Sequence, residues 1–297
     1  MVHTLRAKLQ KKQFVVTVEM EPPRGADPWG VYEKMRPLAG LVDAVNIADS
    51  PMAKMRMSPI ALAYLVQNEL NLETIFHLTC RDRNQLGLQS ELLGAHALGV
   101  KNILTLTGDK PEQGDHPQAT GVFDVDAIGL GKIANSLNNG EDMLGNAIEG
   151  KTNFFIGGVV NPTSDDLEAE LEKLHRKIDA GVGFFQTQPI FDLGQLEKFL
   201  RIADQINVPI IYGLMPLKSA KLAKYLNRQV PGVHVPDQLI DRLEIKGREA
   251  GQEIAEELFK EMKQSLQGVH IFPMGDIQLV ETLLKENYEN VGCKEAI

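Results

Sequence analysis

Short apolar runs rich in β-branched residues alternate along the chain with longer segments of helical periodicity. Apolar runs of four to eight residues bounded by turn residues read as buried strands. The predicted strands are 14–20, 42–48, 73–79, 101–107, 153–159, 183–188, 208–213 and 268–273. Eight strands alternating with helices predict a parallel sheet, and eight is the number that closes a (β/α)8 TIM barrel. A doubly wound open sheet is the rival fold, but no G-x-G-x-x-G follows the first strand.

The helical segments carry their own start and stop signals. The predicted helices include 58–69, 84–98 and 165–180, which open with the capping residues Ser58, Asn84 and Asp165. Glycines at 40, 99 and 181 precede strands, as expected of residues that close helices. The stretch 237–265 predicts an extra-long or doubled helix. Long loops are expected at 108–124, on the catalytic face, and at 137–152, on the opposite face. Without a linker or repeat, 1–297 reads as a single barrel domain.

Composition narrows the functional classes. The chain has 297 residues, is 43% hydrophobic, and carries a net charge of −9 with a pI of about 5.4. This acidity argues against binding driven by nucleic-acid phosphates. No apolar run approaches the roughly 20 residues of a membrane span. The basic N-terminus lacks an apolar secretory segment, so a cytoplasmic protein is expected. Cys80 and Cys293 form no metal-spaced cluster, and no metal site is expected.

Polar residues gather at the carboxyl ends of the predicted strands, where this fold places its active sites. They are Glu19, Glu21, Asp49, Ser50, His77, Thr79, Thr107, Asp109, Asn161, Gln186, Gln188 and His270. The strand interiors otherwise read as apolar. Any one acid in this set could cap a helix or pair with a lysine instead, and Asp109 could simply hold a turn.

Several of these positions have a second interpretation. Gln186 and Gln188 lie two apart on a strand, so both should face one side, where buried amides need partners. His77 could equally be a hydrogen-bonded core histidine. Cys80 is expected to be structural. The methionines of PMAKMRM could pack in the core or cover a planar ligand; they are Met52, Met55 and Met57.

Five motifs in this order resemble the methylenetetrahydrofolate reductase family over about residues 14 to 220. They are VEMEPPRG (18–25), HLTCRDRN (77–84), LTLTGDKP (104–111), RKIDAGVGFFQTQPIFD (176–192) and YGLMP (212–216). The stretches NIADSPMAKMRMSP and GLQSELLGAHALGVKNILTLTGD are similar to the branch in which the reductase is fused to a homocysteine methyltransferase.

The resemblance implies a flavoenzyme that reduces 5,10-methylenetetrahydrofolate to 5-methyltetrahydrofolate. FAD is the implied cofactor, with FMN as the alternative. By position, Glu19 is the implied general acid, Asp109 lies beside the flavin and the pterin, and Gln188 contacts folate or nicotinamide. Glu21 falls where the family varies, which implies no catalytic role. The other implied cofactor contacts are Asp49, His77, Thr79, Thr107, Gly108, Asn161 and Lys177.

The chemistry of the implied reaction assigns opposite tasks to the two acids. The methylene bridge must open to an N5 iminium, which requires a proton on N10. Glu19 could supply it if burial lifts its pKa towards neutrality. An ionised Asp109 would stabilise the cationic iminium.

Departures from the family pattern concern the supply of electrons. Thr107 stands where relatives have an arginine, and Ala220 aligns with an aromatic that stacks on nicotinamide. NADH, NADPH and a partner redox subunit are therefore the alternative electron donors, and the expected assembly is a homo-oligomer or a complex with that subunit. A folate- and flavin-binding subunit that depends on a partner protein is the rival function, and a flavin-free pterin transferase is the third.

Overall fold

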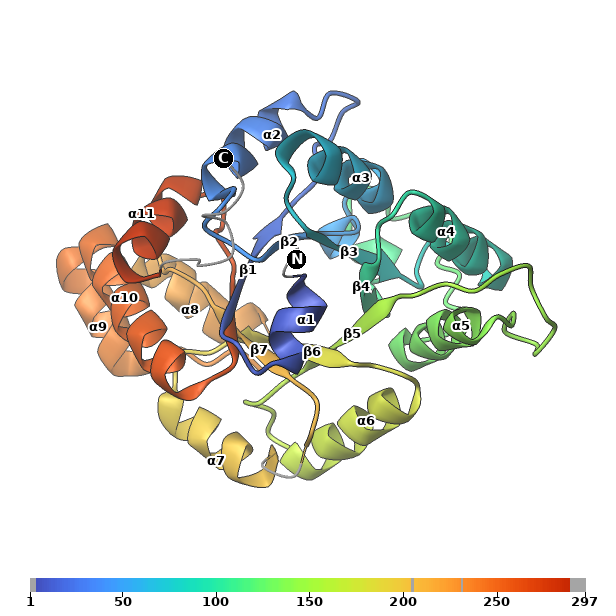
Figure 1. The fold of residues 1–297 in the computed structure, drawn as a ribbon. Coiled ribbons are helices and arrows are strands. Elements are labelled where there is room, and N and C mark those ends of the chain that lie inside the picture. The colour runs from blue at the N-terminus through green and yellow to red at the C-terminus, as the bar shows by residue number, and fades with distance from the viewer. Residues whose placement is uncertain (1–3, 204–205, 231, 289–297) are drawn as a thin grey trace.

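Eight parallel strands close into a barrel that helices surround, as the alternating pattern predicts (Figure 1). The computed structural model describes residues 4–203, 206–230 and 232–288. The strands pair in chain order, and β1 pairs with β8 to close the barrel. They are β1 (Val15–Met20), β2 (Ala44–Ile47), β3 (Thr74–Thr79), β4 (Asn102–Leu106), β5 (Phe155–Val160), β6 (Phe184–Pro189), β7 (Ile210–Leu214) and β8 (Gly268–Ile271). Each predicted strand overlaps one of these.

One helix precedes the first strand, and the others follow strands and cover the outside of the barrel. They are α1 (Leu5–Gln10), α2 (Trp29–Met35), α3 (Pro59–Leu70), α4 (Gln85–Ala97), α5 (Ala127–Asn139), α6 (Leu167–Asp179), α7 (Leu193–Ala203), α8 (Ala220–Gln229), α9 (Asp237–Lys246), α10 (Arg248–Ser265) and α11 (Ile277–Asn287). Three short 3-10 turns are η1 (Arg36–Leu38), η2 (Pro51–Ala53) and η3 (Pro111–Gln113).

The helix boundaries test the predicted caps. Ser58 and Asn84 cap α3 and α4, as expected. The prediction for Asp165 is wrong by one residue: Asp166 caps α6, because its carboxylate accepts a hydrogen bond from the Ala169 amide at 2.9 Å. The predicted doubled helix is α9 followed by α10, and Gly247 separates them with a φ of 56°.

The short helix α1 closes the amino-terminal end of the barrel, and no sequence pattern had predicted it. It lies at the centre of the barrel in Figure 1, seen from that end. Leu5 and Leu9 are fully buried, and they pack on an apolar layer inside the barrel. The members of this layer are Val15, Ala44, Ile75, Leu104, Phe155, Phe184 and Ile211. An ion pair between Lys8 and Asp43 and a hydrogen bond from the Leu5 amide to Glu73 (2.8 Å) hold the helix there.

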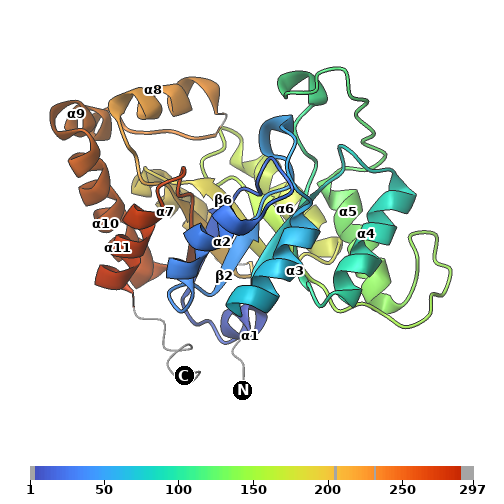
Figure 2. The ribbon, with the colours of Figure 1, turned by 90° about the horizontal axis from the view of Figure 1, so that it is seen from above.

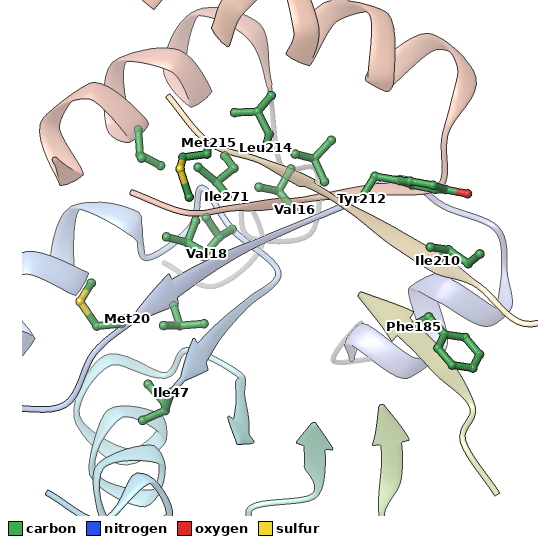
Figure 3. Packing of buried hydrophobic residues seen from close by; sticks show 14 of the residues in the cluster. Val16, Val18, Met20, Ile47, Phe185, Ile210, Tyr212, Leu214, Met215 and Ile271 are labelled. Atoms are coloured by element: carbon green, nitrogen blue, oxygen red, sulfur yellow. The ribbon is translucent and has the colours of Figure 1, made fainter. Parts of the chain in front are cut away.

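Alternation along β1 shows how the sequence divides the two faces of the sheet. Val16, Val18 and Met20 point outward to the helices, where they join the large core cluster (Figure 3). The intervening residues point inward. Val15 lies in the apolar layer above α1, Thr17 is buried one step higher, and Glu19 reaches the carboxyl end. The barrel interior therefore changes from apolar to polar along its axis.

The two long loops lie at opposite ends of the barrel, as predicted (Figure 2). Loop 108–124 joins the mouth at the carboxyl ends of the strands, where Asp115 accepts hydrogen bonds from the Met55 amide (3.0 Å) and from Arg24 (2.8 Å). Loop 137–152 forms a small hairpin and ends beside α1, where Arg6 donates a hydrogen bond to Asn153 at 3.0 Å.

Candidate active site

A cavity of about 340 Å³ opens at the carboxyl ends of the strands. This volume lies in the range of small-molecule sites. Most of the polar strand-end residues singled out in the sequence line it, together with Gly108: Glu19, Asp49, His77, Thr79, Thr107, Asp109, Gln186, Gln188 and His270. The fold therefore brings side chains from six strands and the loops that follow them to one place.

The two glutamates of the VEMEPP motif separate. Glu19 lines the cavity with a side chain that is 27% exposed. The strand ends at Met20, so Glu21 lies beyond it, 50% exposed and paired with Arg56 at 2.8 Å. Glu21 is not among the residues that line the cavity. The chain leaves the sheet between the two acids, so only Glu19 reaches the cavity.

The ionisation of Glu19 differs from the expectation that burial lifts its pKa. Burial raises the pKa, but the interaction with the nearby His270 and the weaker electrostatic influence of His77 outweigh it, so the pKa of Glu19 is lowered. His270 Nε2 lies 3.9 Å from Glu19 Oε2. In the ligand-free protein Glu19 is therefore a carboxylate at neutral pH.

His77 lines the cavity and is also a hydrogen-bonded core residue, so both interpretations apply. Its side chain is 6% exposed, and its Nε2 accepts a hydrogen bond from Asn46 Nδ2 at 2.9 Å. Burial lowers the pKa of His77 to about 4. A neutral imidazole therefore lies in the cavity wall at neutral pH.

Asp49 organises the end of β3. Its Oδ2 accepts hydrogen bonds from the amide and the hydroxyl of Thr79, both at 2.9 Å, and from Arg83 at 2.8 Å. The carboxylate is thus paired and hydrogen-bonded, as a buried acid must be. Asp49 and Thr79 shape the cavity wall together.

The TGD segment after β4 forms the rim. Gly108 has a φ of 94°, and a Cβ there would lie 2.9 Å from the Thr79 Cβ, so only glycine fits. Asp109 is exposed, and its Oδ2 accepts a hydrogen bond from the Met52 amide at 2.8 Å. Thr107 Oγ1 accepts a hydrogen bond from the Ala127 amide at 3.2 Å, which joins the rim to α5.

A β-bulge aims the end of β6 into the cavity. The pairing of β6 with β7 shifts register between Gln186 and Pro189, and bulges of this kind often re-aim side chains beside active sites. Thr187 Oγ1 accepts a hydrogen bond from the Gly213 amide at 2.8 Å. A Cβ on Gly213 would lie 2.5 Å from the Gln188 carbonyl oxygen, so glycine permits the bulge. Gln186 and Gln188 both line the cavity, as predicted.

Two of the expected cofactor contacts lie outside the cavity lining. Asn161 turns back at the end of β5, where its Oδ1 accepts hydrogen bonds from the amide and hydroxyl of Thr163. Lys177 packs between α6 and the barrel wall, and its Nζ donates a hydrogen bond to the Val159 carbonyl at 2.5 Å. Burial lowers the pKa of Lys177.

Other lining residues escaped the sequence analysis. Arg81, only 3% exposed, reaches the cavity from just beyond β3, where its guanidinium pairs with Asp82 at 2.7 Å. Phe272 follows β8 and contacts the His270 ring edge-on, with ring centroids 4.5 Å apart. Arg81 lies two residues past the predicted strand 73–79, whereas Phe272 lies within the predicted strand 268–273 but is not polar.

The expectation of apolar strand interiors is wrong at several positions. Thr17 and Asn46 are buried inside the barrel, where each is hydrogen-bonded to Gln186 at the floor of the cavity. A threonine and an asparagine inside otherwise apolar runs were the available signal.

The remaining candidates lie in ordinary surroundings. Met57 packs against the core, whereas Met52 and Met55 are about half exposed and do not line the cavity. Cys80 is a buried free thiol, as expected of a structural cysteine; Cys293 lies outside the described residues. Within the described ranges, no group of three or more potential metal ligands occurs, and no helix is long and apolar enough to span a membrane.

Comparison with known sequences gives a consistent result. The family model for methylenetetrahydrofolate reductase matches residues 4–287. Methylenetetrahydrofolate reductase 1 of Schizosaccharomyces pombe is 26% identical, and the match covers 74% of this chain and 36% of the relative. Methylenetetrahydrofolate reductase 2 of Saccharomyces cerevisiae is 30% identical, over 69% of this chain and 34% of the relative. The chain thus spans about a third of the length of these relatives. A 5,10-methylenetetrahydrofolate reductase of Pectobacterium carotovorum is 25% identical, over 73% of this chain and 70% of the relative.

Solved structures share the fold at low sequence identity. A Clostridium thermocellum protein described as binding two copies of 5-methyl-5,6,7,8-tetrahydrofolic acid superposes with a TM-score of 0.61 at 16% identity, covering 95% of this chain and 98% of that one. A 2,3-dimethylmalate lyase superposes with a TM-score of 0.52 at 12% identity, covering 95% of this chain and 82% of that one. At these identities the likeness concerns the barrel alone.

Proposed function

Since this chain belongs to the methylenetetrahydrofolate reductase family, we propose that it reduces 5,10-methylenetetrahydrofolate to 5-methyltetrahydrofolate with a flavin cofactor. The observation that carries the proposal is the convergence of Glu19, Asp109 and Gln188 on one cavity. The tetrahydrofolate ligand of the Clostridium thermocellum barrel supports a folate on a fold of this kind.

The cavity has the chemistry of a site for a planar heteroaromatic ring. Leu104, Leu106 and Val159 offer apolar surface, while the hydroxyls, amides and carboxylates around them offer hydrogen-bonding groups. The residues that would hold the flavin ring are His77, Thr79, Gly108 and Asp109. When bound, the flavin, FAD or FMN, supplies the hydride for the folate. Asn161 and Lys177 lie beyond this cavity and would contact only a more distant part of the cofactor.

Glu19 is the proton donor in this proposal. Opening of the methylene bridge places a proton on N10 and leaves an iminium at N5. Glu19 is a carboxylate in the ligand-free protein, but a bound ring would exclude the water that still reaches its side chain. Removal of that water raises the pKa of a carboxyl group, so the folate and its proton would bind together. In the reverse direction the same carboxylate accepts the proton.

Asp109 and Gln188 complete the proposed folate site. A negative charge on Asp109 stabilises the positive iminium in a partly water-excluded cavity. The Gln188 amide has no hydrogen bond to another side chain among the described residues, so it can bind a pterin edge. The proposed roles thus divide into proton transfer, charge stabilisation and orientation.

The position of the cofactor can be tested with two substitutions of matched size. Val159→Trp fills the cavity, whereas Asn207→Trp places the same side chain at the opposite end of the barrel. The wild-type protein and the Asn207 variant should purify with one flavin per chain, measured by absorbance after denaturation. The Val159 variant should fold, by circular dichroism, without flavin. Loss of flavin only from the Asn207 variant would place the cofactor at the amino-terminal end of the barrel and contradict the proposal. A colourless wild-type protein that binds folate would favour the pterin transferase.

A further inference from the structure

Five buried polar side chains cross the inside of the barrel at the floor of the cavity. They are Thr17 of β1, Asn46 of β2, His77 of β3, Gln186 of β6 and His270 of β8, each at most 6% exposed. A polar layer is costly to bury unless every group finds a partner. The layer just below it is apolar.

The hydrogen bonds form one chain across the barrel. Asn46 Nδ2 donates to His77 Nε2 at 2.9 Å and to Gln186 Oε1 at 2.7 Å. Gln186 Nε2 in turn donates to Asn46 Oδ1 and to Thr17 Oγ1, both at 3.2 Å. Thr17 Oγ1 lies 2.8 Å from His270 Nδ1. Every buried side-chain polar atom in the described part of the protein has a partner.

Counting protons along this chain assigns the tautomer of His270. Gln186 Nε2 lies near three acceptors: Asn46 Oδ1 and Thr17 Oγ1, both at 3.2 Å, and His270 Nδ1 at 3.4 Å. The amide nitrogen can only donate, and a hydrogen on Nδ1 would place two donors against each other, so Nδ1 is the acceptor of the His270 ring. His270 consequently carries its proton on Nε2. That nitrogen faces Glu19 Oε2, 3.9 Å away.

We propose that His270 is a positioning residue for Glu19, fixed by Thr17 and Gln186 so that its Nε2–H is directed at the Glu19 carboxylate. This inference rests on the proposed function, in which Glu19 exchanges a proton with the folate N10. When Glu19 gives up its proton, the N–H stabilises the carboxylate that forms. When N10 returns the proton, that interaction weakens and no atom of His270 changes its bonding. Phe272 packs edge-on against the same imidazole, with ring centroids 4.5 Å apart.

The charged surroundings of Glu19 agree with this role. His77 from β3 and His270 from β8 face it, while Asp49, Arg81 and Asp109 line the same cavity from the loops after β2, β3 and β4. Burial raises the pKa of Glu19, and the interaction with His270 is the foremost influence that lowers it. Loss of His270 should therefore move the titration of Glu19 upward.

Carboxyl NMR on the ligand-free protein tests this without substrate or activity. His270→Leu removes the N–H, and its apparent Glu19 pKa should rise by about one unit. His270→Gln keeps an N–H donor and should restore most of the wild-type value. His175→Leu, at an exposed histidine of α6, controls for the loss of a histidine and should leave the titration unchanged.

Thr17→Val provides a second route that leaves the imidazole in place. Without the hydroxyl, the 15N signals of His270 should no longer report a fixed Nε2–H tautomer. The Glu19 pKa should rise, as in His270→Leu. The pH profile of methyltetrahydrofolate oxidation should shift with it.

An unchanged Glu19 titration in folded His270→Leu and Thr17→Val proteins would overturn the inference. If the titration shifts in these variants but the wild-type protein does not oxidise methyltetrahydrofolate, the proposed function is overturned and the role of His270 stands.

Discussion

At the scale of single residues, position along the barrel axis decides what a side chain can do. Thr17 and Glu19 are two residues apart on β1 and both face inward. Thr17 is completely buried and serves only other protein groups, whereas Glu19 meets the cavity and remains partly exposed. On β6 the contrast is smaller, because Gln186 is buried and bonded to Asn46 but still lines the cavity together with Gln188. On β1, two residues along the strand thus change a structural group into one that a ligand can reach.

His77 should make the stability of the protein depend on pH. Its pKa is about 4 in the folded state because it is buried, against about 6.5 when unfolded. Between these pH values only the unfolded chain binds a proton at His77. The stability that the neutral His77 contributes is therefore fully present above about pH 6.5 and is lost as the pH falls towards 4. A fall from about pH 7.5 to about pH 5 should lower the free energy of unfolding by about 2 kcal/mol through His77.

Urea unfolding of the wild-type protein and His77→Gln at both pH values isolates this contribution. Glutamine can still accept the Asn46 hydrogen bond but does not titrate. Other groups lose stability equally in both proteins, so the wild-type protein should lose about 2 kcal/mol more than the variant. Equal losses in the two proteins would show that His77 titrates normally in the folded state.

At the scale of elements, the strands were predictable because burial on both faces leaves a strong signal in the sequence. FVVTVEM, for example, is apolar at nearly every position, as expected of a parallel strand covered by helices. Helix α1 gave no such signal. Its six residues, LRAKLQ, contain only two large apolar side chains. These two leucines become buried only when they pack on the apolar layer at the end of the barrel.

Truncation of a leucine tests whether α1 is part of the folded unit. Leu5→Ala should cost about 2–5 kcal/mol of unfolding free energy, because the side chain is completely buried in the apolar layer. Gln10→Ala, on the exposed side of the same helix, should stay within about 0.5 kcal/mol. Urea unfolding measures both. Equal, small effects would mean that α1 is dispensable and the barrel end closes without it.

Site residues at the ends of strands could be predicted from the sequence. Those in the following loops or deeper inside the barrel could not. Glu19, Gln188 and His270 could be found because a barrel places strand ends at one mouth. Arg81 comes from a loop whose path no pattern specifies. The chain of bonds through Asn46 could not be predicted either, since it joins strands from opposite sides of the barrel.

At the scale of the whole molecule, the supply of electrons is the open part of the proposed reaction. Ala220 begins α8 and is not among the residues that line the cavity; Phe272, from the end of β8, is the aromatic that does. Because the aligned stacking aromatic is missing, nicotinamide should lose on the order of 1 kcal/mol of contact. We therefore predict slow anaerobic flavin reduction by NADH and NADPH.

Stopped-flow absorbance with each nucleotide measures that rate. Rapid bleaching at micromolar NADH or NADPH would show that the barrel accepts nicotinamide without this aromatic. Slow bleaching, together with rapid reduction by methyltetrahydrofolate, would support a partner redox protein as the electron source.

The central claim is that Glu19 moves the proton of the folate reaction at the carboxyl-end cavity. Anaerobic reduction of the bound flavin by 5-methyltetrahydrofolate tests it directly in Glu19→Gln and in the matched variant Glu21→Gln. The Glu19 variant should retain its flavin and its reduction by dithionite, but its rate with the folate should fall by about 10²–10⁴-fold. The Glu21 variant should react at nearly the wild-type rate, because Glu21 lies outside the cavity and pairs with Arg56. A wild-type rate in Glu19→Gln, or a dead Glu21→Gln, would contradict the account.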